Sequence, residues 1–207
     1  MYIPAQFLQQ DVDVALKLIA AEPFGMLIST VEGMPVVSHI PFVIAESEPE
    51  LVLVAHLAKA NPHWRTLDGV RATAVFRGPH GYISPSYYTD PKHNVPTWNY
   101  EVVHCSGKVN IAPESEKITI LKRLVDAMED GLPAPWNLDA MDVAYRDGLM
   151  GAIVAFTLRV DQLQAKFKLG QNRDAADRAG AVAGLRATGR NGNAALANEM
   201  ENCPSDA

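Results

Sequence analysis

The sequence contains little of what several common protein classes require. Its 207 residues include only two cysteines, Cys105 and Cys203, and no C-x-x-C pair, which argues against a disulfide framework or a thiolate metal site. No apolar run approaches the roughly 18 residues that a membrane-spanning helix needs. The start, Met1-Tyr2-Ile3-Pro4, has neither the charged nor the apolar region of an export signal. We therefore expect a cytoplasmic protein without a membrane segment.

Positive charge and familiar catalytic motifs are also scarce. Lys and Arg number 18 against 24 Asp and Glu, a formal net charge of −6, whereas a nucleic-acid surface needs clustered cations. The chain lacks G-x-S-x-G, H-E-x-x-H, a P-loop and a G-x-G-x-x-G after a strand. These absences argue against simple hydrolases and nucleotide triphosphatases. The six histidines are scattered, so a zinc site between His56 and His63 is disfavoured and we expect no metal.

The residues that are present favour one main domain with mostly β structure. Hydrophobic residues make up 48% of the chain, enough for one sizeable core. Helical spacing predicts a helix over 11–22, with Asp11 as its cap and Pro23 as its stop, and another over 113–130. A short helix is expected over 61–67 and helical pieces after Arg173. Apolar, β-branched runs predict strands over 24–31, 35–44, 51–57, 72–83 and 97–111, and a last strand region made of 152–160 with 162–169 after it.

One segment, His56-Leu57-Ala58-Lys59-Ala60-Asn61-Pro62-His63-Trp64, has the composition of a phosphate site. A strand ends there in small residues and a lysine, immediately before a helix capped by Asn61. Free N–H groups at a helix start, with Lys59 as counter-charge, would suit a dianion. An ordinary strand-to-helix turn with a solvated lysine is the alternative.

Three further segments carry polar or aromatic residues in strands. Ser38-His39 interrupts an apolar run, and a buried pair there needs partners, either a planar heterocycle or a backbone carbonyl. Trp98 and Tyr100 share one face of a strand, with Asn99 on the other, which suits either a core or a stacked ring. The segment Lys166-Phe167-Lys168-Leu169-Gly170-Gln171-Asn172-Arg173 is either a solvated edge strand or a polar arm that reaches a ligand.

Together these segments resemble the PaiB-like FMN-binding proteins, a family described as negative transcriptional regulators within the pyridoxamine-phosphate-oxidase-like split-barrel group. The resemblance spans about residues 1 to 200. Its landmarks are Met1–Pro4, His39–Phe42, His56–Trp64, Gly78–Pro85, Val95–Tyr100 and Lys168–Arg173. At Gly170 the family pattern leads us to expect serine, whose hydroxyl would add a hydrogen bond to the phosphate.

The resemblance implies an α+β fold that is mainly β: a six-stranded antiparallel split β-barrel with flanking helices. It implies a homodimer with FMN at the interface. The domain would cover 1–173, with a helical appendage over 174–200 and a flexible tail over 201–207. The flavin ring would lie along Ser38, His39, Ile40 and Pro41, and the phosphate at His56, Ala58, Lys59 and Asn61. Further contacts, from elsewhere or from the partner subunit, would come from Trp98, Asn99, Gln171, Asn172 and Arg173.

Three functions remain open on these residues. The first is a transcriptional regulator with a flavin-linked or redox-sensing role, although the nearly neutral stretch 174–200 makes direct DNA binding doubtful. The second is an FMN-dependent oxidoreductase, with His80, His93 and Tyr87 beside the Pro-rich loop 84–96 as candidates for a substrate pocket. The third is haem handling, for which His56 or His104 would have to coordinate iron.

Overall fold

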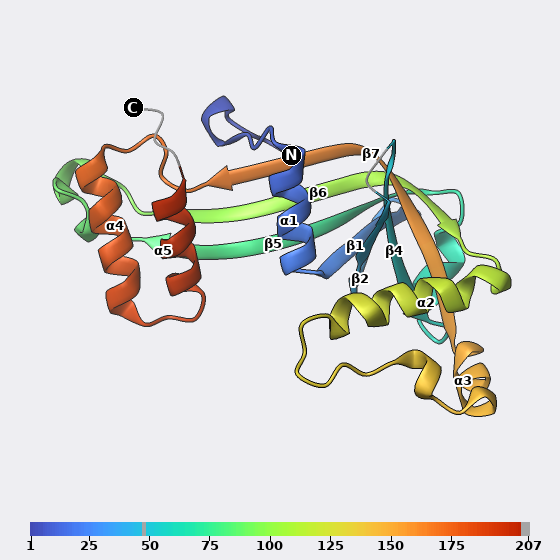
Figure 1. Cartoon of the computed structure of the whole chain (residues 1–207). Coiled ribbons are helices and arrows are strands. Elements are labelled where there is room, and N and C mark those ends of the chain that lie inside the picture. Colours follow the sequence, from blue (N-terminus) through green and yellow to red (C-terminus); the bar gives the residue numbers. More distant parts are fainter. Residues whose placement is uncertain (47–48, 204–207) are drawn as a thin grey trace. The chain divides into compact units, whose positions relative to one another are not determined.

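The computed structural model describes residues 1–46 and 49–203 (Figure 1). Its strands are β1 Phe24–Val31, β2 Met34–Pro41, β3 Val43–Glu46, β4 Leu51–Ala58, β5 Arg71–Ile83, β6 Thr97–Ile111 and β7 Ile153–Lys168. Its α-helices are α1 Val12–Ala21, α2 Glu114–Glu129, α3 Val143–Met150, α4 Ala175–Thr188 and α5 Asn193–Asn202. Short 3-10 helices are η1 Ala5–Phe7, η2 Pro62–Thr66, η3 Pro85–Tyr87, η4 Pro91–His93 and η5 Leu138–Ala140.

The α+β class is confirmed, but the expected number of six strands is wrong. The described residues form a seven-stranded sheet in the order β2-β1-β5-β6-β7-β4-β3. The predicted strand 35–44 divides at Phe42, whose N–H donates to the Pro23 carbonyl at 2.9 Å. The Phe42 ring then packs edge-on against Phe76 and Phe156. As a result β2 pairs with β1 and β3 pairs with β4, both antiparallel. Closure of the sheet into a barrel stays a prediction.

The chain forms two compact units. One contains Met1–Leu18, Arg77–Val103 and Gln164–Ala207, and the other contains Ile19–Phe76 and His104–Leu163; we call them the first and second unit. In the second unit β4 pairs with β7 along its whole length, from Leu51 opposite Val160 to Ala58 opposite Ile153. Helix α2 packs on this pair, burying Ile120 and Leu124 against Val54 and Ala155. The helix therefore supports the strand that leads into the predicted phosphate site.

In the first unit, α4 and α5 lie side by side (Figure 1). Leu185 and Leu196 are fully buried in this pair, and the Asn193 amide donates to Thr188 Oγ1 at 2.7 Å and to the Leu185 carbonyl at 3.3 Å. Tyr87 packs directly against the backbone of α4 at Gly180 and Gly184, where a Cβ at Gly184 would stand 2.4 Å from the Tyr87 ring. Packing therefore fixes Tyr87, one of the three residues proposed for a substrate pocket.

Two parts of the helical pattern differ from expectation. Helix α3 was not predicted; its cap is Asp142, whose carboxylate accepts from the Tyr145 N–H at 2.9 Å. Helix α5 continues to Asn202, so Glu201 and Asn202 of the expected tail are helical, while 204–207 lie outside the described residues. Across the described chain, no helix has both the length and the apolar character needed to cross a membrane.

Candidate functional site

The turn after β4 has the local structure that the sequence predicts, with one difference. Asn61 caps η2 by accepting from the His63 N–H at 3.0 Å, and Pro62 follows the cap. The Trp64 indole donates to the Lys59 carbonyl at 2.9 Å, which ties the turn to the 3-10 helix. The expectation of several free N–H groups at the start of this helix is wrong. The helix η2 has only five residues, and the Asn61 side chain already accepts a hydrogen bond from the His63 N–H. Any anion at this turn therefore depends on side chains more than on a helix dipole.

His63 is the centre of a buried polar network that the sequence analysis missed. Its ring nitrogens bond the hydroxyls of two serines, Nδ1 with Ser38 and Nε2 with Ser29, each at 2.8 Å. The Asn61 amide also donates to Ser38 Oγ at 3.1 Å. Burial lowers the pKa of His63, so its imidazole is neutral and donates to one serine while it accepts from the other. The network joins β1, β2 and the turn after β4.

The residues predicted to contact the flavin ring point to different faces of β2, as the pleat of a strand requires. Ser38 is buried and bonded to His63, whereas His39 faces outward and stacks on the exposed ring of Phe24 at 6.5 Å. Ile40 and Pro41 at the end of β2 are half-buried. The histidine that satisfies the buried serine is thus His63 and not its neighbour His39. Two serines within otherwise apolar strands were the available sequence signal.

His56 and Lys59 keep free polar groups beside this turn. Nδ1 of His56 is buried and has no hydrogen-bond partner among the described residues, and burial lowers the pKa of the ring. Lys59 and Ala58 are exposed, and no side-chain bond of Lys59 occurs within the described part of the chain. A buried nitrogen without a partner is uncommon and costs free energy. A ligand at the end of β4 would remove that cost.

In the first unit, Trp98 and Asn99 lie on opposite faces of β6, as predicted. Trp98 is 53% exposed and Asn99 3%. His80 stacks on Trp98 with an interplanar angle of 21°, and Tyr82 meets the same ring edge-on. Arg77, His80, Trp98, Tyr100 and Val102 line a hollow of about 340 Å³. Among the proposed substrate-pocket residues only His80 lies in this hollow, since His93 is exposed and paired with Asp90 at 2.6 Å.

The segment after β7 contains three predicted contacts with different roles. The Gln171 side chain donates to the Phe167 carbonyl at 2.6 Å and accepts from the Leu169 N–H at 2.8 Å, so it stabilises its own turn. The Arg173 guanidinium lies 4.6 Å from the centre of the Tyr88 ring and donates to Asn94 Oδ1 at 2.6 Å. Asn172 is exposed and lines a small pocket together with Asn99 and Arg173.

Gly170, where the family pattern suggests serine, has a backbone reason to be glycine. Its φ is +84°, in the left-handed region that side chains disfavour. The turn that follows is closed by the Arg173 N–H donating to the Gly170 carbonyl at 3.0 Å. The glycine therefore fits the observed turn, which brings Arg173 back toward the end of β7.

Glu101, two residues after Asn99, gives the first unit a pH-dependent stability. The residue is 5% exposed, and burial together with the charge of Glu199 raises the pKa of its carboxyl from 4.5 to about 7. The protonated form is favoured in the folded state, so this contribution to stability is complete below about pH 4.5 and is lost as the pH rises through 7.

Glu101→Gln should therefore stabilise the protein at pH 8 by about 2 kcal/mol and have almost no effect at pH 4.5. Chemical denaturation at the two pH values measures the difference. Glu32→Gln, in the exposed turn between β1 and β2, is the control. An equal effect of Glu101→Gln at both pH values would exclude the proposed protonation.

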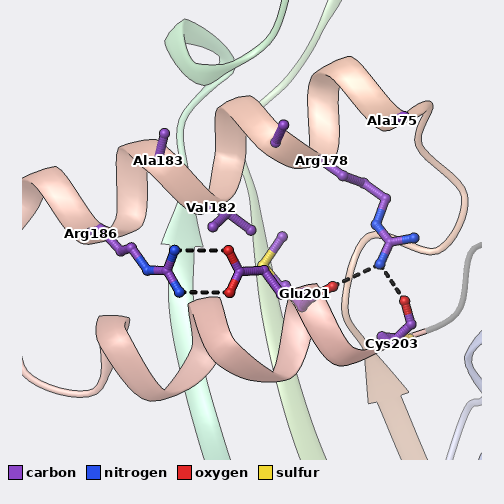
Figure 2. A pocket seen from close by; sticks show the side chains of 9 residues that line it. Ala175, Arg178, Val182, Ala183, Arg186, Glu201 and Cys203 are labelled. Carbon is purple, nitrogen blue, oxygen red and sulfur yellow. Dashed lines mark hydrogen bonds and ion pairs between the residues drawn. The ribbon is translucent and has the colours of Figure 1, made fainter.

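A pocket of about 710 Å³ lies between α4 and α5 (Figure 2). Arg186 forms a two-pronged pair with Glu201, at 2.8 and 2.6 Å. Arg178 donates to the carbonyls of Met200 and Cys203 at 2.7 and 2.5 Å. Two of the arginines in this helical pair therefore bond within the protein.

The sequence profile described as "Putative FMN-binding domain" matches residues 1–162. The protein "Protease synthase and sporulation protein PAI 2" of Bacillus subtilis is 32% identical over 178 residues, covering 86% of this chain and 85% of that protein.

Two solved structures show the same fold. The FAD and heme binding protein of Mycobacterium smegmatis has a TM-score of 0.60 at 18% identity, covering 77% of this chain and 72% of that one. The flavocytochrome Anf3 of Azotobacter vinelandii has a TM-score of 0.57 at 17% identity, covering 78% and 69%. The profile match and the identity to PAI 2 show that the chain belongs to the FMN-binding domain family and is a homologue of PAI 2, with FMN as its cofactor.

Proposed function

We propose that this protein is a flavin-linked regulator in which FMN is held at the turn after β4. The phosphate would lie beside His56, Ala58, Lys59 and Asn61, and the flavin ring along the strand segment Ser38, His39, Ile40 and Pro41. Trp98, Asn99 and the segment Gln171–Arg173 would contact FMN from the partner subunit of a homodimer. The flavin would carry electrons, while the protein orients it and sets its electrostatic environment.

The unpartnered Nδ1 of His56 is the observation that most supports this site. It lies on β4, two residues before Ala58 and three before Lys59, at the strand end where a polar ligand would bind. The neutral imidazole can donate or accept there, and the Lys59 ammonium supplies the counter-charge for a phosphate. The residues present therefore fit FMN, although the contribution of the helix dipole is small.

The visible absorbance of the freshly purified protein tests the proposal first. Flavin bands support it, a Soret band would indicate haem handling instead, and a colourless protein that does not take up added FMN would contradict it. The haem alternative would need His56 or His104 as an iron ligand.

Lys59→Glu should weaken FMN binding by about tenfold, close to 1.4 kcal/mol, because it replaces an attractive charge by a repulsive one at an exposed position. The binding constant is measured by flavin fluorescence during titration. Lys92→Glu makes the same change of charge at the exposed η4 and should bind FMN as the parent does. Equal binding by both variants would exclude Lys59 from the site.

A regulatory role is suggested by the name of the relative, "Protease synthase and sporulation protein PAI 2". Direct DNA reading is not expected, because a recognition helix needs free basic side chains and Arg178 and Arg186 are bonded to the end of α5. We infer that any regulation operates through the flavin state. A mobility-shift assay at moderate salt should show no tight, sequence-dependent binding.

A second candidate, an FMN-dependent oxidoreductase, is favoured by the hollow beside His80 and Trp98. Its aromatic walls suit a small planar substrate. Anaerobic titration with NADH and NADPH separates the two functions, since rapid bleaching of the flavin followed by turnover with an acceptor indicates an enzyme.

The domain organisation and the oligomeric state are part of the same proposal. We infer a split barrel over 1–173, with 174–200 as a helical appendage, acting as a cytoplasmic homodimer. Light scattering coupled to size exclusion measures the oligomeric state, and a monomer that retains FMN would contradict an interfacial cofactor.

A further inference from the structure

Three cations gather at the end of β7 without a carboxylate bonded to them. Lys166 donates to the Tyr2 carbonyl at 3.2 Å and lies over the rings of Tyr2 and Tyr100. Lys168 donates to the Thr97 hydroxyl, and Arg173 to the Asn94 side chain. Within residues 1–46 and 49–203, none of the three takes part in an ion pair. Their partners are all neutral oxygens and aromatic rings.

The repulsion between these positive charges destabilises the folded protein, and little nearby negative charge offsets it. Burial lowers the pKa of Lys168, and the charges of Lys166 and Arg173 lower it further. One carboxylate, Asp177, interacts with Arg173, but it also accepts two hydrogen bonds from Thr89, at 2.8 and 2.9 Å. Like charges held close together destabilise each other unless an anion is present.

A pocket of about 130 Å³ opens between Lys168 and Arg173. Its wall also includes Thr97, Asn99 and Asn172. The volume is far below the roughly 300–1,000 Å³ of pockets that hold whole drug-sized ligands, so it suits a single charged group. An ammonium, a guanidinium and amide N–H groups are the donors that bind phosphate and carboxylate oxygens.

We propose that this pocket is an oxyanion site in which Lys168 and Arg173 bind a phosphate or carboxylate group, with Asn172 at its rim. Two sources have this chemistry: the phosphate of FMN, or the anionic group of a separate small molecule that reacts with or regulates the flavin. The site shares Asn99, Asn172 and Arg173 with the flavin contacts proposed above. It requires only the geometry of the first unit; the first source would place the FMN phosphate here in place of the turn after β4, whereas the second leaves the phosphate at that turn.

Titration of the purified protein with inorganic phosphate, at constant ionic strength set with chloride, tests the site by the thermal midpoint. Phosphate should raise the midpoint of the parent. Lys168→Met keeps the aliphatic stem and should weaken the apparent phosphate affinity at least tenfold. Lys92→Met removes the same charge at an exposed position of the first unit and should respond as the parent does.

A second variant, Asn172→Asp, separates loss of phosphate binding from loss of the fold. Asn172 is exposed and its side chain makes no bond within the described chain. Asn172→Asp therefore adds a negative charge at the rim with little change in volume, and it should abolish the response to phosphate while circular dichroism stays unchanged. A parent that does not respond to phosphate, or an undiminished response in both Lys168→Met and Asn172→Asp, overturns the proposal.

To identify which molecule supplies the anionic group in the pocket, the phosphate titration is repeated on protein saturated with riboflavin and on protein saturated with FMN. A response with riboflavin that disappears with FMN identifies the cofactor's own phosphate. A response in both identifies a separate anionic molecule. Flavin content is measured independently by absorbance, so a failure to bind FMN is distinguished from a failure of the oxyanion site.

Discussion

Gly107→Ala should destabilise the protein by more than about 3 kcal/mol and leave most of it insoluble on expression. A Cβ at this position of β6 would stand 1.8 Å from the Arg159 carbonyl oxygen and 2.7 Å from its carbon. Both are backbone atoms of β7, so no side-chain rotation can relieve the overlap. The strands would have to separate where β7 also pairs with β4. Soluble yield and the urea midpoint measure the effect.

Gly148→Ala is the matched control. Gly148 lies within α3, and a Cβ there would meet nothing within 4 Å. Alanine is the better helix former by about 1 kcal/mol, so this variant should be as stable as the parent or slightly more. A Gly107→Ala protein that unfolds within error of the Gly148→Ala protein would refute the close approach of β6 to β7.

His63→Leu should cost about 3 kcal/mol of folding stability, because it leaves the buried Ser29 hydroxyl without its partner and the Ser38 hydroxyl with the Asn61 amide alone. Leucine fills a similar volume, so the loss measures the missing hydrogen bonds more than a cavity. The free energy of unfolding at pH 8, from urea titration, checks the magnitude. His93→Leu, at a side chain 82% exposed, should change it by less than about 0.5 kcal/mol.

A double-mutant cycle sharpens this test. If the loss arises from unsatisfied hydroxyls, Ser29→Ala should cost less in the His63→Leu background than in the parent, because its hydroxyl is already without a partner. Equal costs in the two backgrounds would show that Ser29 and His63 contribute independently. In the parent, the buried neutral imidazole also predicts a loss of stability as the pH falls below 6.5, since the unfolded chain binds the proton more readily.

The sequence predicts the regular elements well where one local signal dominates. The apolar run 24–31 and the run 97–111 have the bounds of β1 and β6, and Asn61-Pro62 marks the start of η2. The division of β2 from β3 could not be predicted, because Phe42 leaves the sheet to reach Phe76 and Phe156, which are distant in the sequence. Helix α3 was missed because it is short and mostly exposed.

The candidate site is also only partly predictable from the sequence. The alternation of Trp98 and Asn99 follows from the pleat of a strand, and the sequence predicts it correctly. The roles of His63 and Gln171 could not be deduced, because each depends on which polar group folding brings within bonding distance. A polar residue in an apolar strand indicates that a partner exists, and only the folded chain identifies that partner.

The contacts between α4 and α5 imply that these helices open together. Arg186 and Arg178 bond the end of α5, and Asn193 bonds the end of α4. None of these links passes through the connection at Gly189–Gly192. Amide hydrogens of the two helices should therefore exchange with deuterium at one common free energy, and a protease that cuts the connection should leave the C-terminal fragment bound to the rest of the protein.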